Sequence, residues 1–112
     1  HGLAHITGGG LVENPPRCFA ADLSARIDHS AWPVPPVFGW LARAGGIAPL
    51  EMLRTFNCGI GMVAVVPPAE APAVTAALTA AGERVYRIGT LEACGADMAP
   101  VIFENMTTSW PI

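Results

Sequence analysis

The sequence contains no lysine, and few of its residues carry a charge. All six positive charges are scattered arginines, and only 13 % of the residues are charged, against about 25 % in typical soluble domains. Nucleic-acid-binding domains usually gather basic residues on one face, so this distribution argues against that class. The longest apolar run, at 60–66, is far too short to span a bilayer, and no signal-peptide pattern is visible. We therefore predict a cytoplasmic protein with no nucleic-acid or membrane partner.

The chain also lacks any cysteine pattern that indicates a disulfide or a metal site. Cys18, Cys58 and Cys94 are widely spaced, with no C-x-x-C pair and no zinc-ligand spacing. Separated cysteines in odd number are typical of reduced thiols in the cytosol. Cys58 adjoins an apolar stretch, which predicts a small core residue.

What the chain has in excess is apolar surface. Hydrophobic residues make up 52 % of the 112 residues, too many for a disordered segment. A domain of this length buries roughly two-thirds of its unfolded surface. The apolar excess indicates a domain that buries further surface in a larger parent. Because the first residue is His and not Met, we expect this chain to be part of a longer protein.

Apolar periodicity and turn residues predict alternating strands and helices. Residues 11–14 form one expected helical turn, and His29 is expected on the surface. A helix that begins at Pro35-Pro36 and ends at Gly45-Gly46 is expected to turn Phe38, Trp40 and Leu41 toward the core. Pro49 opens a second short helix, and residues 69–81 a third. Strands are predicted over 3–6, 24–28, 58–66, 84–91 and 101–104.

This order of elements predicts an α/β or α+β fold with a mixed sheet. The stretch 58–66 is almost continuously apolar, which is typical of a central strand covered on both faces.

A glycine-rich loop follows the first predicted strand. Gly8, Gly9 and Gly10 lack a Cβ, so their amides can approach a ligand closely. Successive amides of this kind can form an anion-binding concavity. The alternative is a tight turn between strand and helix that binds nothing.

Two separated blocks resemble one known family. The first is HGLAHITGGG at 1–10 followed by ENPPR at 13–17, and the second is RTFNCGIGM at 54–62. Both are similar to the C-terminal domain of phosphoribosylformylglycinamidine cyclo-ligases, also called aminoimidazole ribonucleotide synthetases. The resemblance implies a three-layer α/β/α domain, partly ferredoxin-like and truncated at its N-terminus. Residues 1–105 are assigned to this domain and 106–112 to a tail.

The resemblance also implies an activity for the parent enzyme. The family uses ATP and Mg²⁺ to convert formylglycinamidine ribonucleotide to aminoimidazole ribonucleotide, ADP and phosphate. It implies that ATP and Mg²⁺ are bound mainly by an N-terminal domain absent here, and that the full-length enzyme is a homodimer. We expect the fragment alone to be inactive and to hold no cofactor of its own.

The same resemblance implies a set of site residues. His5 is expected to donate to a phosphoryl oxygen or to move a proton, although a hydrogen bond within the sheet would explain it equally well. Arginine binds phosphate bidentately, with a simple ion pair as the alternative. Asn57 would orient substrate amides or cap a helix end. The remaining expected ligand contacts are Thr7, Gly8, Gly9, Gly10, Asn14, Arg17 and Arg54.

A second function stays open at this point. A non-catalytic domain of a related superfamily member, which binds a phosphosugar or nucleotide or supports assembly, would carry much the same loop. Calorimetry with substrate and ATP distinguishes the two: binding of substrate alone favours the cyclo-ligase, and binding of neither favours a role in assembly.

Overall fold

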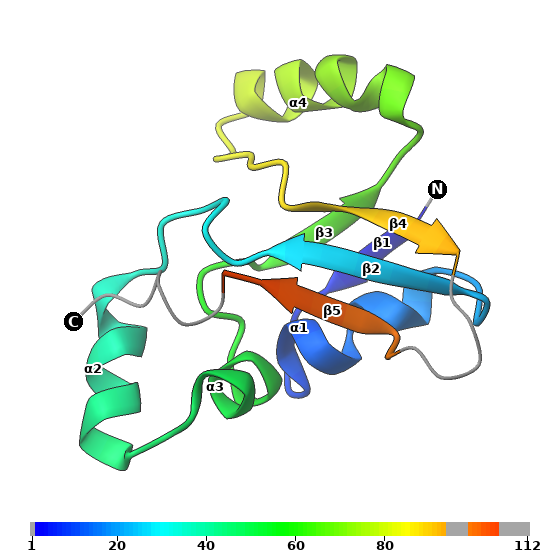
Figure 1. The fold of residues 1–112 in the computed structure, drawn as a ribbon. Helices are drawn as coiled ribbons and strands as arrows, with labels where there is room; N and C mark the ends of the chain where they lie inside the picture. Colours follow the sequence, from blue (N-terminus) through cyan, green and yellow to red (C-terminus); the bar gives the residue numbers. More distant parts are fainter. Residues whose placement is uncertain (1, 94–98, 106–112) are drawn as a thin grey trace.

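The computed structural model describes residues 2–93 and 99–105. Figure 1 shows its helices and strands, which belong to an α+β fold. Cys94 and the expected tail at 106–112 lie outside the described residues. In chain order the elements are β1 (Gly2–His5), α1 (Gly10–Glu13), the 3₁₀ turn η1 (Pro15–Cys18), β2 (Leu23–Asp28), α2 (Pro36–Gly45), α3 (Pro49–Thr55), β3 (Met62–Val65), the 3₁₀ turn η2 (Pro68–Glu70), α4 (Ala71–Ala80), β4 (Gly89–Ala93) and β5 (Val101–Glu104).

The described strands form two sheets. β1 and β3 make an antiparallel pair, and the second sheet has the order β4-β2-β5. In this second sheet β2 runs antiparallel to β4 and parallel to β5, so the sheet is mixed as predicted. The predicted final strand at 101–104 is confirmed.

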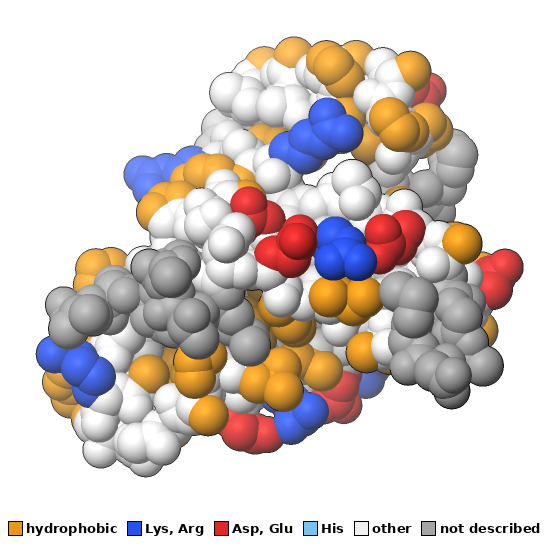
Figure 2. Space-filling view, viewed as in Figure 1, with side chains coloured by type: hydrophobic (Ala, Val, Ile, Leu, Met, Phe, Trp, Pro, Cys, Tyr) orange, Lys and Arg blue, Asp and Glu red, His pale blue; other side chains and the backbone are white. Residues whose placement is uncertain are grey.

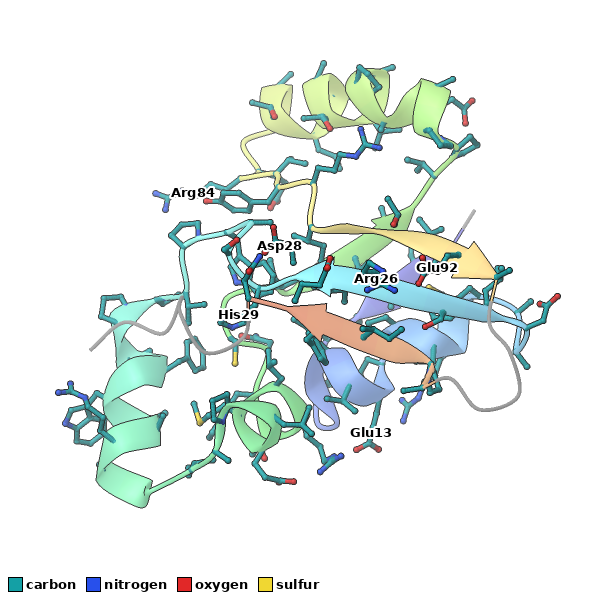
Figure 3. The ribbon with its side chains drawn as sticks, viewed as in Figure 1. Glu13, Arg26, Asp28, His29, Arg84 and Glu92 are labelled. Carbon is teal, nitrogen blue, oxygen red and sulfur yellow. The ribbon has the colours of Figure 1, made fainter. Side chains whose placement is uncertain are left out.

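β2 has one apolar and one charged face because side chains alternate along a strand. Ala25 and Ile27 are buried, whereas Arg26 lies on the outer face. Arg26 pairs with Glu92 of β4 at 2.8 Å and lies 3.8 Å from Glu104 of β5. Figure 2 shows acidic side chains on either side of a cationic one across this face, and Figure 3 shows Arg26 and Glu92 side by side. The charged side chains leave this face of the sheet polar.

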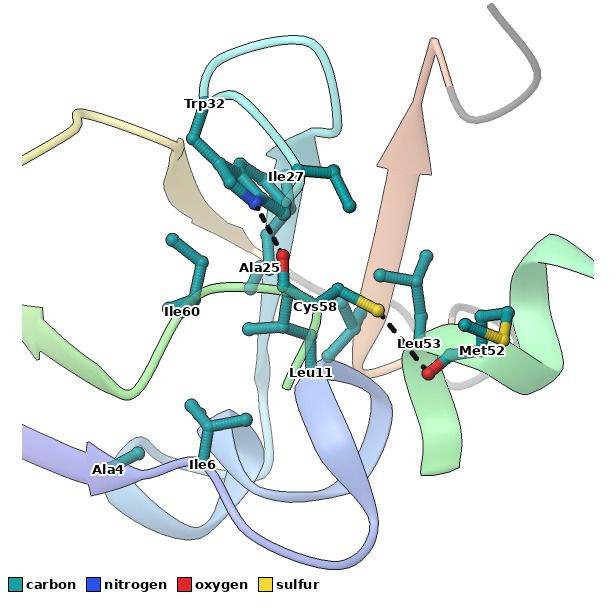
Figure 4. Close-up of a cluster of buried hydrophobic side chains, with 12 residues drawn as sticks. Ala4, Ile6, Leu11, Ala25, Ile27, Trp32, Met52, Leu53, Cys58 and Ile60 are labelled. Atoms are coloured by element: carbon teal, nitrogen blue, oxygen red, sulfur yellow. Dashed lines mark hydrogen bonds between the residues drawn. The ribbon is translucent and has the colours of Figure 1, made fainter. Parts of the chain in front are cut away.

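The core lies between the inner face of the β4-β2-β5 sheet and the segments that follow β1 and α2. Leu11, Met52 and Leu53 belong to the same core cluster as Ala25 and Ile27 of β2, and Figure 4 shows Leu11 between α1 and this strand. Cys58 is fully buried among them, which confirms its predicted place, and burial raises the pKa of its thiol to about 12. The indole Nε1 of Trp32 donates to the Cys58 carbonyl oxygen at 3.1 Å. This bond joins the connector before α2 to the turn before β3.

Helix α2 begins and ends where proline and glycine predict. Pro36 occupies the first turn, and Gly46 ends the helix in the left-handed region with φ 61°. The predicted core face is wrong for Trp40, which is 59 % exposed. Phe38 and Leu41 do pack against the core, whereas Trp40 lies on the side of α2 that faces solvent.

The predicted central strand at 58–66 is also wrong in extent and position. β3 covers only Met62–Val65, pairs with β1 in a two-stranded sheet, and exposes 57 % of Met62. Cys58 and Gly59 both have positive φ, so the chain turns before the strand begins. A continuous apolar run cannot distinguish a covered strand from a buried turn that leads into an edge strand.

The region after α4 differs from its prediction. The predicted helix at 69–81 is observed as η2 followed by α4, but the strand predicted over 84–91 is observed at Gly89–Ala93. Pairing with β2 starts only at Gly89, opposite Ile27. A Cβ on Gly89 would overlap the backbone of Arg26, so the sheet begins where glycine allows close approach. Among the described residues, no helix is long and apolar enough to cross a membrane.

His29 is buried, and the surface position predicted for it is therefore wrong. It follows β2 (Figure 3), is fully buried, and meets the Trp32 ring edge-to-face at 5.1 Å between centroids. Its backbone amide donates to the Glu104 carbonyl oxygen at 2.9 Å. Burial lowers the pKa of the His29 imidazole, and the neighbouring Asp28 carboxylate only partly opposes this. The prediction for His29 followed from its neighbour Asp28 in the sequence, which does not indicate that the turn after β2 folds over the core.

The lowered pKa of His29 predicts acid destabilisation. Above the ordinary value of 6.5 the group is neutral in both folded and unfolded chains, so its contribution is fully present. As pH falls from 6.5 toward the depressed folded pKa, the unfolded state binds the proton first, and stability falls by up to about 1.4 kcal/mol per pH unit until the folded state is protonated too. Urea unfolding from about pH 7.5 to 5 should show this slope in the wild type and a flatter one in His29→Phe. Equal slopes in both proteins would contradict the assignment.

Candidate functional site

Strand β1 delivers two polar side chains to the surface. Ala4 and Ile6 are buried in the core, and alternation places His5 and Thr7 on the opposite, exposed side. Within the described residues the His5 imidazole makes no hydrogen bond. His5 and Thr7 therefore face solvent from the same side of the chain.

The glycine loop divides into an open and a closed part. The Gly10 amide donates to the Thr7 carbonyl oxygen at 2.9 Å, and Gly10 is buried. Gly8 is exposed and Gly9 half-buried, and their amides have no hydrogen-bond acceptor in the described part of the chain. Gly9 has φ 100°, a conformation that favours glycine. Of the three expected contacts, Gly8 and Gly9 are the ones with amides left for a ligand.

Gly10 is held against helix α3. A Cβ at this position would overlap the Leu53 carbonyl oxygen and lie 2.7 Å from that of Phe56. Its φ of 58° also lies in the left-handed region. The third glycine thus permits the contact between α1 and the end of α3, and its amide is committed to the turn.

Asn14 holds the glycine loop from its buried side by hydrogen bonds to Thr7 and Gly8. It is only 2 % exposed, and its Oδ1 accepts from the Thr7 amide at 2.5 Å and from the Thr7 hydroxyl at 3.4 Å. Its Nδ2 donates to the Gly8 carbonyl oxygen at 3.2 Å. Sequence reasoning singled out Asn14 as a ligand contact and missed this role. The available sequence signal was the place of Asn14 at the end of the predicted helical turn, seven residues after Thr7.

The 3₁₀ turn η1 brings Arg17 to the same place. Pro15 and Pro16 set the backbone of this turn, and the Arg17 amide donates to the Asn14 carbonyl oxygen at 3.1 Å. Arg17 is exposed and forms no ion pair among the described residues. A hollow of about 310 Å³ is lined by Leu3, Ala4, His5, Thr7, Asn14 and Arg17.

Four of the predicted site residues thus meet at one hollow, with Gly8 and Gly9 adjoining it in the chain. The hollow offers an imidazole, a hydroxyl and a guanidinium, and two free amides lie next to Thr7. Donors of these kinds suit an anion such as a phosphate.

Besides Gly10, two further predicted residues, Arg54 and Asn57, are engaged elsewhere. Arg54 forms an ion pair with Glu51 in α3, as the simpler alternative for that arginine supposed. The Asn57 side chain accepts from the Gly59 amide at 2.9 Å, which stabilises the turn before β3. Neither lines the hollow.

A larger hollow of about 460 Å³ has a different character. It lies beside the ends of β2, β3 and β4, and its lining is largely apolar. Cys18 is among its lining residues, and the Cys18 thiol donates to the Pro15 carbonyl oxygen at 3.1 Å. This hollow offers no set of donors for an anion.

The described residues do not supply a metal site. Among residues 2–93 and 99–105, no three His, Cys, Asp or Glu side chains converge. Glu13 on α1 points away from the other acidic groups labelled in Figure 3. The residues present do not fit a bound Mg²⁺, so no chemical step is derived through that ion.

Comparisons with known proteins agree with the two sequence blocks. The family described as AIR synthase related protein, C-terminal domain, matches residues 1–99. A phosphoribosylformylglycinamidine cyclo-ligase of Paraburkholderia phymatum is 60 % identical over 90 residues, which are 80 % of this chain and 25 % of that protein. The enzyme of the same name from Burkholderia vietnamiensis is 59 % identical over 92 residues, 82 % of this chain and 26 % of the relative. The chain spans about a quarter of the length of these curated relatives.

Proposed function

This chain belongs to the AIR synthase related protein family, whose C-terminal domain it matches, and we propose that it forms the C-terminal part of an ATP-dependent cyclo-ligase. The observation that carries this proposal is the identity of 60 % over 80 % of the chain to a cyclo-ligase. The reaction would close the imidazole ring of aminoimidazole ribonucleotide from formylglycinamidine ribonucleotide. It belongs to purine biosynthesis and is expected in the cytoplasm.

The chemistry divides into activation and ring closure. ATP phosphorylates the formamide oxygen, which becomes a leaving group, and the neighbouring amidine nitrogen attacks that carbon and expels phosphate. Such phosphoryl transfer depends mostly on positioning and on stabilisation of charge. A site with neutral and cationic donors around an anion performs that part of the task.

The residues around the hollow have separate roles in this proposal. Arg17 and the amides of Gly8 and Gly9 hold a phosphate of substrate or nucleotide, and the Thr7 hydroxyl adds a further donor. His5 lies beside them and donates to a phosphoryl oxygen or moves a proton near neutral pH. Support comes from the meeting of His5, Thr7 and Arg17 at one exposed hollow, with Gly8 and Gly9 next to Thr7 in the chain.

The remaining parts of the site would lie in portions of the enzyme outside this sequence. We propose that ATP and Mg²⁺ are held mainly by an N-terminal domain, and that the complete enzyme is a homodimer. The 112-residue chain alone should therefore show no turnover with ATP, Mg²⁺ and substrate.

The proposal is tested by exchanging the matching segment of the Paraburkholderia phymatum enzyme for this chain. The chimaera should close the ring with kcat/KM within about tenfold of the parent. Arg17→Ala in the chimaera should lower kcat/KM by roughly 10- to 100-fold, because a hydrogen bond to a charged group contributes about 1.5–3 kcal/mol. Arg43→Ala removes the same charge from the exposed end of α2 and is the matched control.

The outcomes separate the candidate functions. A folded chimaera that binds phosphate without turnover would favour a non-catalytic binding domain. An Arg17→Ala variant as active as Arg43→Ala would remove Arg17 from the proposed site.

A further inference from the structure

We propose that Asn14 is a positioning residue, which holds the Thr7–Gly9 loop in the shape that receives an anion and does not itself contact the anion. This inference rests on the proposed function, since it takes the loop to be a ligand contact. It replaces the expectation that the Asn14 amide orients the substrate directly.

The side-chain amide of Asn14 is already occupied by the loop. Its Oδ1 takes two donors from Thr7, and its Nδ2 donates to the Gly8 carbonyl oxygen. Both ends of the amide therefore act on the same short segment. With 2 % of the residue exposed, little of it remains for a ligand.

These contacts determine which amides point outward. The Thr7 amide donates to Asn14 Oδ1, and the Gly10 amide donates to the Thr7 carbonyl oxygen at 2.9 Å. The amides between them, those of Gly8 and Gly9, have no acceptor in the described residues. By fixing the Gly8 carbonyl oxygen on the buried side, Asn14 directs the peptide unit between Gly8 and Gly9 so that its N–H group faces away from the core.

The loop needs these hydrogen bonds because its glycine-rich backbone can otherwise adopt many conformations. Three consecutive glycines lose more backbone entropy on ordering than other residues do. Gly10 is immobilised by packing against α3, but a Cβ at Gly8 would meet nothing within 4 Å. The open part of the loop is held by the hydrogen bonds of Asn14 and by the Glu13 amide, which donates to the Gly9 carbonyl oxygen at 3.1 Å. Of these, only the Asn14 side chain contacts both Thr7 and Gly8.

The test follows the loop by ¹⁵N-resolved NMR of the 112-residue chain, with and without inorganic phosphate. In the wild type, the Gly8 and Gly9 amide resonances should shift on titration with phosphate. In Asn14→Ala, the Thr7, Gly8 and Gly9 resonances should already differ before phosphate is added. Phosphate affinity should fall by about tenfold and Thr7 amide exchange should accelerate by about the same factor, as expected for lost hydrogen bonds.

Two further variants separate positioning from general destabilisation. Asn14→Asp keeps the acceptors for Thr7 and should keep the Thr7 amide exchange within about threefold of wild type. Ser30→Ala removes a comparable loop contact, the 2.5 Å bond from the Ser30 hydroxyl to Asp28, and should leave the Gly8 and Gly9 response to phosphate unchanged.

The possible contradictions are distinguishable. If Asn14→Ala weakens phosphate binding while the ligand-free resonances of Thr7, Gly8 and Gly9 match the wild type, Asn14 contacts the anion and the inference fails. If neither the resonances nor the affinity change, it also fails. If phosphate leaves Gly8 and Gly9 unshifted in the wild type itself, the loop contacts in the proposed function are the part that fails.

Discussion

Gly10→Ala is expected to lower the free energy of unfolding by about 2–6 kcal/mol, because two costs combine at this position. A residue with a Cβ at φ 58° carries roughly 1–3 kcal/mol of backbone strain. The added Cβ would also overlap the Leu53 carbonyl oxygen, and overpacking costs roughly 1–3 kcal/mol. The two contacts of this Cβ are the carbonyl oxygens of Leu53 and Phe56. Both are backbone atoms at the end of α3, so neither can move away as a flexible side chain would. Urea unfolding followed by circular dichroism measures the loss.

Gly8→Ala is the matched control two residues earlier in the same loop. A Cβ there would meet nothing within 4 Å, and Gly8 does not have positive φ. Its stability should therefore stay within about 1 kcal/mol of wild type. Equal losses at Gly8 and Gly10 would mean that the loop does not pack on α3 as the structure shows.

Trp32→Ala is expected to cost about 3–5 kcal/mol, the range for a large aromatic side chain removed from a core. The side chain is 4 % exposed and packs edge-to-face on His29. Its removal also takes the donor from the Cys58 carbonyl oxygen, which lies 3.1 Å from the indole nitrogen. A buried acceptor left without a donor adds to the loss. The unfolding midpoint in urea should fall accordingly.

Trp40→Ala tests the same substitution at a surface position. Trp40 is 59 % exposed on α2, so its loss should change stability by no more than about 1 kcal/mol. Similar losses for the two tryptophans would contradict the exposed position of Trp40 on α2 and restore the core face expected from the sequence.

Local rules predicted the elements whose determinants lie within a few residues. Pro36 and Gly46 set the ends of α2 through their own backbone preferences. The strand predicted at 24–28 is observed as part of β2, with Ala25 and Ile27 facing the core. These features hold because proline, glycine and a two-residue period act whatever the rest of the chain does.

The positions that were mispredicted depend on distant partners. Whether His29 is buried depends on Trp32 and on β5, far along the chain. Whether residues 58–66 form a central strand depends on which strand they pair with, and β3 pairs only with β1. An apolar run shows that a segment can be buried and leaves open what buries it.

The candidate site shows the same division. The sequence by itself determined the family, the glycine loop and the residue types available to hold an anion. Only the tertiary structure decided that Arg17 meets His5 and Thr7 at one hollow, that Arg54 and Asn57 do not, and that Gly10 packs on α3. Residue type and spacing determine which donors exist, whereas long-range packing of η1 and α3 against the loop decides which of them converge.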